Sequence, residues 1–267
     1  MFFKSKPIIF ISTLLALLSF NVQSTVVEIR TSLGVIEVNL FDNTTPETVA
    51  NFLSYANAGA YADSVVHRSV SNFVIQGGGF TYTGPVAVNS FSLDSISTGT
   101  PVVNDPRLSN MRGTIAMAKS SNPDSATSQW FINLSNNANS LDVATNAGGF
   151  TVFGQVVGDG MQVVDAIAAL TLLNGGGTFG ELPIRNYSQT DVDNEVQITD
   201  DNLVVIFDIV VTNMAADSAD NLNPTLNTLV NGPTGGSGSG SSGGGGTMGW
   251  LLILGLVMLQ KTRLLKR

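Results

Sequence analysis

The sequence predicts a mainly β protein, built as one closed eight-stranded antiparallel barrel capped by two helices. Three observations support this prediction. The strongly apolar segments are short and rich in β-branched and aromatic residues, only two stretches repeat apolar residues at helical spacing, and glycines separate many of the segments. Short strands joined by glycine-rich turns are typical of small antiparallel barrels.

The first two strands are expected at residues 25–31 and 34–41. Both stretches, TVVEIRT and GVIEVNLF, alternate apolar and polar residues, and Ser32-Leu33-Gly34 between them suits a hairpin turn. Alternation with a period of two puts every second side chain on the same face. The folded domain therefore begins as a sheet with one buried face.

Two helices are expected. The first follows a pair of threonines and Pro46, with Glu47 three residues after Thr44 as in a capping box, and Gly59 marks its end. The second covers about residues 161–170, MQVVDAIAAL, and follows a glycine-rich joint. Both stretches place apolar residues on one helical face, so we expect both to pack against the barrel.

The remaining apolar segments complete the barrel, and two longer stretches interrupt it. Further strands are expected within residues 65–70, 73–76, 114–118, 129–134, 151–157 and 203–212. Segments 81–110 and 172–202 do not fit as strands, and we expect them to be surface loops. Loops of this length in a compact domain are either functional or tolerated insertions, and length alone does not decide between these.

Residues 1–24 are typical of a secretory signal peptide. Lys4 and Lys6 precede an apolar run over 8–20, and small residues surround a cleavage point after Ser24. The alternative is an uncleaved membrane anchor, but the run is short for a membrane span. The sequence therefore predicts an exported protein, located in the periplasm, at the cell surface or secreted.

The C-terminal end has a different composition. A flexible linker is predicted over 214–247 and includes the run GPTGGSGSGSSGGGG, which has no side chains to build a core. Residues 248–267 follow as an apolar segment with a basic end, which resembles the bacterial GlyGly-CTERM sorting tail. This tail predicts contact with the membrane, either until the tail is cleaved or permanently if it is not cleaved. A plain tail anchor is the alternative.

Charge and cysteine content limit the possible functions. The two terminal segments contain six of the 12 Lys and Arg residues and none of the 20 Asp and Glu residues. Residues 25–247 therefore carry a formal charge of 6 − 20 = −14. An acidic body argues against nucleic-acid binding. The chain has no cysteine, which excludes disulfides and thiolate chemistry.

Metal, phosphate and nucleophile chemistry are all poorly supported. One histidine and no cysteine cannot supply the usual zinc ligands. The acidic stretch 191–201 leaves calcium open as an alternative, although it lacks the EF-hand spacing. Gly77 to Gly79 lack the lysine of a phosphate loop, and we expect them to form a sharp turn or a close backbone approach. His67 lies in an alternating run and is expected to be a scaffold residue.

Four motifs together resemble a known family. VHRSVSNFVIQGGGF at 66–80 resembles the cyclophilin signature, and RGTIAMA at 112–118, SATSQWFIN at 125–133 and FTVFGQVVGDGMQVVDAI at 150–167 continue the match in order. The match extends over residues 25–213 at compatible spacings. It implies a cyclophilin-like domain there, with peptidyl-prolyl cis-trans isomerase activity.

The resemblance also implies roles for individual residues. Arg68 matches the family's catalytic arginine, Gln76 the polar group that helps to hold it, and Phe73 part of the apolar wall that receives the proline ring. We predict these three as catalytic residues. The predicted substrate-binding residues are Phe131, Leu141, Val74, Gln129, Ala118, Lys119 and Phe150. Among them Ala118 and Lys119 match a segment whose backbone pairs with the bound peptide.

This chain departs from the family pattern at several positions. Ser71 replaces a common proline and Trp130 a common phenylalanine, and the family's pocket-rim histidine aligns near Phe150, so this chain lacks that histidine. Val74 replaces a common methionine and is shorter and stiffer, so the pocket is expected to be slightly wider. None of these changes removes the residues that the reaction needs.

The sequence therefore predicts a monomeric isomerase that acts on proline-containing polypeptides outside the cytoplasm, without metal or cofactor. An X-Pro bond rotates slowly because resonance raises a barrier of about 18–20 kcal/mol, and a charged guanidinium can stabilise the twisted state. Two alternatives remain open: a non-catalytic module that binds proline-containing segments in the same groove, and a surface scaffold.

Overall fold

The computed structural model describes residues 25–213 and 222–230. The predicted signal peptide, most of the predicted linker and the C-terminal tail lie outside these residues. Within the described ranges, the longest apolar helix falls short of what a membrane crossing requires. The predictions about both ends of the chain therefore stay predictions.

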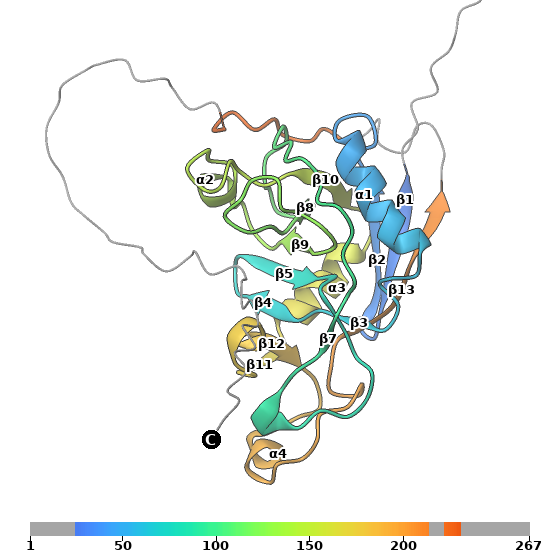
Figure 1. The fold of residues 1–267 in the computed structure, drawn as a ribbon, viewed down its shortest axis with the longest axis vertical. Coiled ribbons are helices and arrows are strands. Elements are labelled where there is room, and N and C mark those ends of the chain that lie inside the picture. Colours follow the sequence, from blue (N-terminus) through green and yellow to red (C-terminus); the bar gives the residue numbers. More distant parts are fainter. Residues whose placement is uncertain (1–24, 214–221, 231–267) are drawn as a thin grey trace, which may run out of the picture.

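The described part of the chain is mainly β, with few helices (Figure 1). The strands of the main sheet are β1 Val26–Thr31, β2 Gly34–Leu40, β3 Ser64–Val65, β4 Arg68–Val70, β5 Val74–Gly77, β6 Phe80–Thr81, β7 Asp94–Ser95, β8 Thr114–Met117, β9 Trp130–Asn133, β10 Val152–Val156 and β13 Val205–Asn213. A second, two-stranded sheet consists of β11 Thr171–Leu173 and β12 Leu182–Ile184. The helices are α1 Pro46–Asn57, α2 Ala138–Leu141, α3 Gly160–Ala168 and α4 Gln189–Asp193, with 3-10 turns η1 Val88–Ser90 and η2 Gly177–Phe179.

The predicted closed eight-stranded barrel is not confirmed. The main sheet has eleven strands in the order β4-β5-β9-β8-β10-β2-β1-β13-β3-β6-β7, all its neighbours pair antiparallel, and no described ladder joins its edge strands β4 and β7. The additional strands arise because the predicted strand at 65–70 is divided into β3 and β4, and because β6 and β7 extend the sheet beyond β3. The result is a curled antiparallel sheet.

The sheet curls where the chain changes hydrogen-bond partners between two adjacent residues. The Val66 N–H donates to the Val204 carbonyl at 3.0 Å, whereas the His67 N–H donates to the Gln76 carbonyl at 3.0 Å. Consecutive residues are therefore bonded toward β13 on one side and toward β5 on the other. This change of partner brings two distant parts of the sheet together around a common interior.

The predicted hairpin is confirmed. β1 and β2 pair from Val26 opposite Asn39 to Thr31 opposite Gly34, without a bulge. The side chains that alternate inward, among them Val27 and Ile29, have no exposed surface. The Thr31 hydroxyl donates to the Gly34 carbonyl at 2.7 Å and closes the turn.

Both predicted helices are present, but the predicted cap of the first is not. α1 begins at Pro46 after Thr45, whose side chain makes no capping hydrogen bond and instead reaches the Val152 carbonyl at 3.4 Å. α3 begins one residue earlier and ends two residues earlier than expected. The short helices α2 and α4 were not predicted, because four or five residues give too little helical periodicity to recognise.

The interior of the curled sheet is filled by aromatic and branched side chains. Phe52 of α1 lies with its ring centroid 5.1 Å from that of Phe153 and 5.6 Å from that of Tyr61. Trp130 is fully buried among them. The Tyr61 hydroxyl donates to the Ser128 carbonyl at 2.8 Å, so burial of this phenol leaves no polar group unsatisfied.

The two long segments expected as surface loops bury apolar side chains against each other. Phe91 from segment 81–110 packs on Phe179 from segment 172–202, with ring centroids 5.0 Å apart. Val86 and Ile198 form an antiparallel bridge between the segments. They build a separate apolar cluster beside β3 at the end of the molecule where Figure 1 places α4, β11 and β12.

The described part of the predicted linker, residues 222–230, contacts the domain. The Ser109 N–H donates to the Thr225 carbonyl at 2.8 Å, and the Asn227 N–H donates to the Arg107 carbonyl at 2.8 Å. The Asn227 side chain also reaches the Asp142 carbonyl at 3.0 Å. Figure 1 shows this segment, in orange-red, running across the molecule near α2.

Gly78 occupies a position that no other residue fits. Its φ is +73°, and a Cβ there would lie 2.7 Å from the Ser128 carbonyl oxygen. Such a contact is shorter than van der Waals separation, so either the neighbouring backbone moves or the residue remains glycine. The predicted close backbone approach in the glycine run is confirmed at this residue.

We expect Gly78→Ala to destabilise the domain more than Gly59→Ala. Both glycines have similar positive φ, +73° and +69°, but a Cβ at Gly59 meets nothing within 4 Å. The left-handed conformation should cost about 1–2 kcal/mol in each variant, and the steric contact about 1–3 kcal/mol more at Gly78. Urea denaturation of the two variants measures the difference; equal losses would show that the Ser128 backbone yields without cost.

Candidate active site

Three neighbouring strands place three of the predicted site residues, Arg68, Gln76 and Phe131, in one row. Arg68 of β4 lies opposite Gln76 of β5, Gln76 lies opposite Phe131 of β9, and Phe131 lies opposite Ala116 of β8. Residues directly opposite each other in a sheet present their side chains on the same face. The ladder register therefore aligns a cation, an amide and an aromatic ring across the sheet.

The amide of Gln76 is engaged with a second predicted residue. Its Nε2 donates to the Gln129 Oε1 at 2.8 Å, and the Gln76 side chain is almost fully buried. The sequence led us to expect that Gln76 helps to hold Arg68. The structure places the two residues side by side in the ladder but directs the Gln76 amide to Gln129.

The predicted apolar wall is assembled. Phe73, Val74, Ala118, Phe131, Leu141 and Phe150 belong to one apolar cluster. The rings of Phe131 and Phe150 pack edge to face, with centroids 5.8 Å apart and planes at 71°. All predicted apolar site residues therefore lie together, next to the row that begins at Arg68.

Lys119 supports this apolar wall through contacts with Ala147 and Phe150. Its Nζ donates to the Ala147 carbonyl at 2.6 Å and lies 4.3 Å from the centroid of the Phe150 ring. Burial lowers the pKa of Lys119 to about 8. The cation therefore fastens the chain that carries Phe150. The adjacent Ala118 N–H already donates to the Gln129 carbonyl at 2.9 Å, so this group is not free for a bound peptide.

A buried network of asparagine side chains supports the apolar wall through the Phe73 carbonyl. The sequence did not predict this network. The Asn137 amide donates to the Phe73 carbonyl at 2.8 Å and to the Asn133 side chain at 2.7 Å. Asn133 continues to Asn110, whose amide reaches the Asp142 carboxylate at 2.8 Å. These bonds fix α2 and Phe73 relative to each other. No sequence pattern identifies such partners, because they come from separate segments.

Glu181 is a further residue that the sequence analysis missed. The Arg68 Nε donates to the Glu181 Oε2 at 2.9 Å, and this is the acidic partner of Arg68 among the described residues. The Glu181 carbonyl accepts the Ser69 N–H at 2.8 Å. Glu181 lies in segment 172–202 and is the only acidic residue in the sequence between Asp165 and Asp191. This isolated position is the one sequence signal that could have singled it out.

The described residues hold no cluster of three or more His, Cys, Asp or Glu side chains that could bind a metal. In the acidic stretch proposed as a calcium alternative, the Asp191 carboxylate accepts the Ser188 N–H and hydroxyl at the start of α4. This carboxylate therefore caps a helix.

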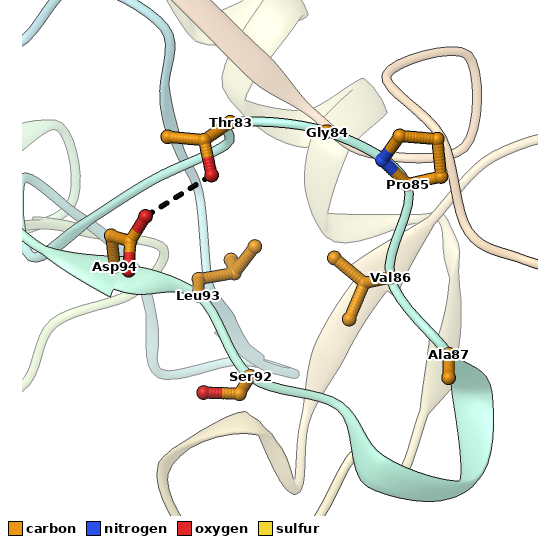
Figure 2. A pocket seen from close by; sticks show the side chains of 8 residues that line it. All are labelled: Thr83, Gly84, Pro85, Val86, Ala87, Ser92, Leu93 and Asp94. Carbon is orange, nitrogen blue, oxygen red and sulfur yellow. Dashed lines mark hydrogen bonds between the residues drawn. The ribbon is translucent and has the colours of Figure 1, made fainter.

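A separate hollow of about 420 Å³ lies on segment 81–110 (Figure 2). Its lining residues are Thr83, Gly84, Pro85, Val86, Ala87, Ser92, Leu93 and Asp94. The one bond drawn there joins the Thr83 hydroxyl to the Asp94 carboxylate at 3.1 Å. None of the predicted site residues lines this hollow.

His67 is a fully buried scaffold residue, although it precedes Arg68 directly. Its ring packs edge to face on Phe80, with centroids 4.9 Å apart, and near Phe179 at 6.5 Å. Neither ring nitrogen forms a well-aligned hydrogen bond to a described residue, although the Val65 backbone lies close. Burial, reinforced by the charge of Arg68, lowers the pKa of His67 to about 3. The imidazole is therefore neutral at physiological pH.

Comparisons with known proteins agree on one family. A model described as cyclophilin type peptidyl-prolyl cis-trans isomerase/CLD matches residues 26–189. A peptidyl-prolyl cis-trans isomerase from Acinetobacter baylyi is 44% identical over 147 residues, which cover 54% of this chain and 72% of that protein. Peptidyl-prolyl cis-trans isomerase A from Dickeya dadantii is 42% identical, covering 61% and 84%. Peptidyl-prolyl cis-trans isomerase B from Escherichia coli is 38% identical, covering 56% and 88%.

The buried His67 should make stability depend on pH. The unfolded chain binds a proton at His67 near pH 6.5 and the folded chain only near pH 3, so the folded state loses stability as pH falls from 6.5 toward 3. At pH 4.5 the loss relative to pH 7 should be about 2–3 kcal/mol. Urea unfolding of the parent and His67→Phe at both pH values measures this; the same pH-dependent loss in both proteins would contradict it.

Proposed function

The chain belongs to the cyclophilin-type peptidyl-prolyl cis-trans isomerases, and on this premise we propose that it accelerates X-Pro rotation in proteins exported from the cytoplasm. The observation that carries the catalytic part is the row of Arg68, Gln76 and Phe131 across three paired strands. It aligns a permanent cation with an aromatic pocket on one face. The substrates are proline-containing segments of polypeptides.

The reaction needs stabilisation of a twisted amide. Resonance makes the C–N bond partly double and sets a barrier of about 18–20 kcal/mol, so uncatalysed rotation takes tens of seconds or more. As the bond twists, the lone pair returns to the imide nitrogen, which then accepts a hydrogen bond. A group that donates to this nitrogen only in the twisted state lowers the barrier.

Arg68 is the donor that this site offers. Arginine carries a permanently charged guanidinium with five N–H groups in a fixed geometry. The Arg68 side chain is 21% exposed, enough to meet a substrate while partly shielded from water. Partial shielding strengthens a charged hydrogen bond, because the surrounding dielectric constant is lower than that of water.

The apolar wall supplies the second requirement, a grip on the proline ring. Phe73, Phe131 and Leu141 belong to a single apolar cluster, and the Phe150 ring packs edge to face against Phe131. Holding the ring while the preceding carbonyl turns converts binding into rotation about one bond. The paired amides of Gln76 and Gln129 lie between wall and cation, where they can bind the substrate backbone.

A non-catalytic module that binds proline segments would use the same wall. Such a module has no need of a partly buried guanidinium beside the pocket, and burying part of a charge is costly unless it serves a purpose. The observed position of Arg68 therefore favours the isomerase over the binding module.

The site of action rests on the two ends of the chain. A signal-peptide pattern over residues 1–24, an acidic body without cysteine, and an apolar, basic C-terminal segment together support export, with a C-terminal contact to the membrane until the tail is processed. The protein then acts as a monomer on clients in the periplasm or at the cell surface.

We expect Arg68→Ala to lower kcat/KM on a proline peptide about 100- to 1,000-fold, because the variant removes the donor to the twisted nitrogen. Arg68→Lys keeps the charge but not the fixed geometry and should keep only part of the rate. A protease-coupled assay measures these rates. Arg107→Ala is the control, since the Arg107 side chain is largely exposed and its partner among the described residues is Asp105.

Two results would decide against this mechanism. An inactive parent protein that still binds the proline peptide would support the binding module. An active parent whose rate survives Arg68→Ala would keep the isomerase but remove Arg68 from its mechanism.

Export can be tested directly on the protein from its native cells. We expect fractionation to find it outside the cytoplasm, and mass spectrometry to show an N-terminus at Thr25 and the loss of Arg267. An intact Arg267 with membrane association would indicate the plain tail anchor. A cytoplasmic protein that retains Met1 would contradict export.

A further inference from the structure

We propose that Glu181 is a positioning residue for the reaction: it holds Arg68 by its Nε and so directs the two terminal amino groups of the guanidinium toward the substrate. The inference rests on the proposed isomerase function and adds to it a residue from outside the sequence motifs. Glu181 itself does not touch the substrate; it acts through Arg68.

The backbone of Glu181 is fixed to the strand that carries Arg68. Its carbonyl accepts the Ser69 N–H at 2.8 Å, while its carboxylate binds the Arg68 side chain at 2.9 Å. Two consecutive residues of β4 are thus bound by one residue of the facing segment. The carboxylate is therefore held in place by a main-chain bond as well as by its own ion pair.

The flanking side chains anchor this segment. Leu182 is fully buried and Phe179 nearly so, in the cluster that also contains Phe91. Leu182 belongs to β12, which pairs with β11. Because buried residues on both sides of Glu181 in the sequence anchor its backbone, the carboxylate has little freedom to leave the guanidinium. The contact can therefore fix the orientation of the Arg68 guanidinium.

The chemistry of the contact matters as much as its presence. Nε lies on the stem side of the guanidinium, and the terminal amino groups lie on the outer side. A bond at Nε restricts rotation of the planar group and leaves both outer amino groups as donors. No other hydrogen bond of the Arg68 guanidinium occurs within residues 25–213 and 222–230.

Gln76 does not provide this support, although it lies opposite Arg68 in the ladder. Its amide donates to Gln129. Without Glu181, the Arg68 side chain would have no described partner to hold it. Glu181, from segment 172–202, therefore supplies the hydrogen bond that holds the Arg68 guanidinium, which Gln76 does not.

The arginines of the other ion pairs in the described domain are more exposed to solvent than Arg68. The side chains of Arg30, Arg107 and Arg112 are 46%, 64% and 47% exposed, whereas that of Arg68 is 21% exposed. Exposed pairs contribute little to stability. Since Glu181 is itself 42% exposed, its removal should affect stability little and the reaction rate much more.

The test is Glu181→Gln in the full chain, which removes the charge but keeps an acceptor oxygen and the size of the side chain. We expect kcat to fall about tenfold with KM within about twofold of the parent, because binding is kept while the donor loses its orientation. NMR exchange between cis and trans forms of a proline peptide gives kcat and KM separately. Glu195→Gln, which removes one charge from an exposed site in the same segment, should match the parent.

A second variant separates an effect through Nε from a general effect of charge. Lysine has no Nε–H group, so in the Arg68→Lys background Glu181→Gln should change the residual kcat by less than about twofold if the carboxylate acts by holding the guanidinium plane. An equal tenfold loss in both backgrounds would overturn the proposal. So would an unchanged or raised kcat for Glu181→Gln alone, or a loss of rate explained by a lower urea midpoint.

A readout independent of activity keeps this inference distinguishable from the proposed function. The Arg68 Nε–H signal of the ¹⁵N-labelled protein should exchange with water faster in Glu181→Gln than in the parent and in Glu195→Gln. An unchanged exchange rate would overturn the positioning role even in an active enzyme. If the parent were inactive, the faster exchange would still support the Arg68–Glu181 contact while the isomerase function failed.

Discussion

The structure depends on the change of hydrogen-bond partner between Val66 and His67. Because one residue bonds toward β13 and the next toward β5, the sheet curls around a single interior. The same step buries the His67 ring and places the next residue, Arg68, at the partly exposed start of β4. Scaffold and candidate site are therefore set by adjacent residues of one segment: His67 is fully buried, and Arg68 keeps part of its side chain exposed.

Four sets of contacts support the candidate site. The ladder through Gln76 aligns Arg68 with Phe131, the asparagine network holds Phe73 against α2, and Lys119 fastens the chain that carries Phe150. The long segment 172–202 adds Glu181, whose carboxylate binds Arg68. The proposed reaction needs a donor and an apolar wall held in fixed positions, and these contacts hold Arg68, Phe73 and the chain that carries Phe150.

The sequence predicted what is local or carried by a motif. The first hairpin, both longer helices and the grouping of Phe73, Phe131 and Leu141 follow from periodicity or from the family resemblance. The ladder edges did not follow, because pairing between β3, β6 and β7 depends on where a long insertion folds back. Glu181 and Asn137 could not be identified either: each is an ordinary polar residue until a segment distant in sequence brings it to its partner.

The central claim is that a proline segment binds over the row formed by Arg68, Gln76 and Phe131 and rotates there. An NMR titration of the ¹⁵N-labelled protein with a proline peptide tests this directly, with the peptide's own cis and trans signals observed in the same sample. We expect coupled shifts of the Arg68 Nε–H and the Gln76 and Gln129 side-chain amides, together with enzyme-dependent exchange between the two peptide forms. Shifts confined to the hollow lined by Thr83 to Asp94, with no such exchange, would contradict it.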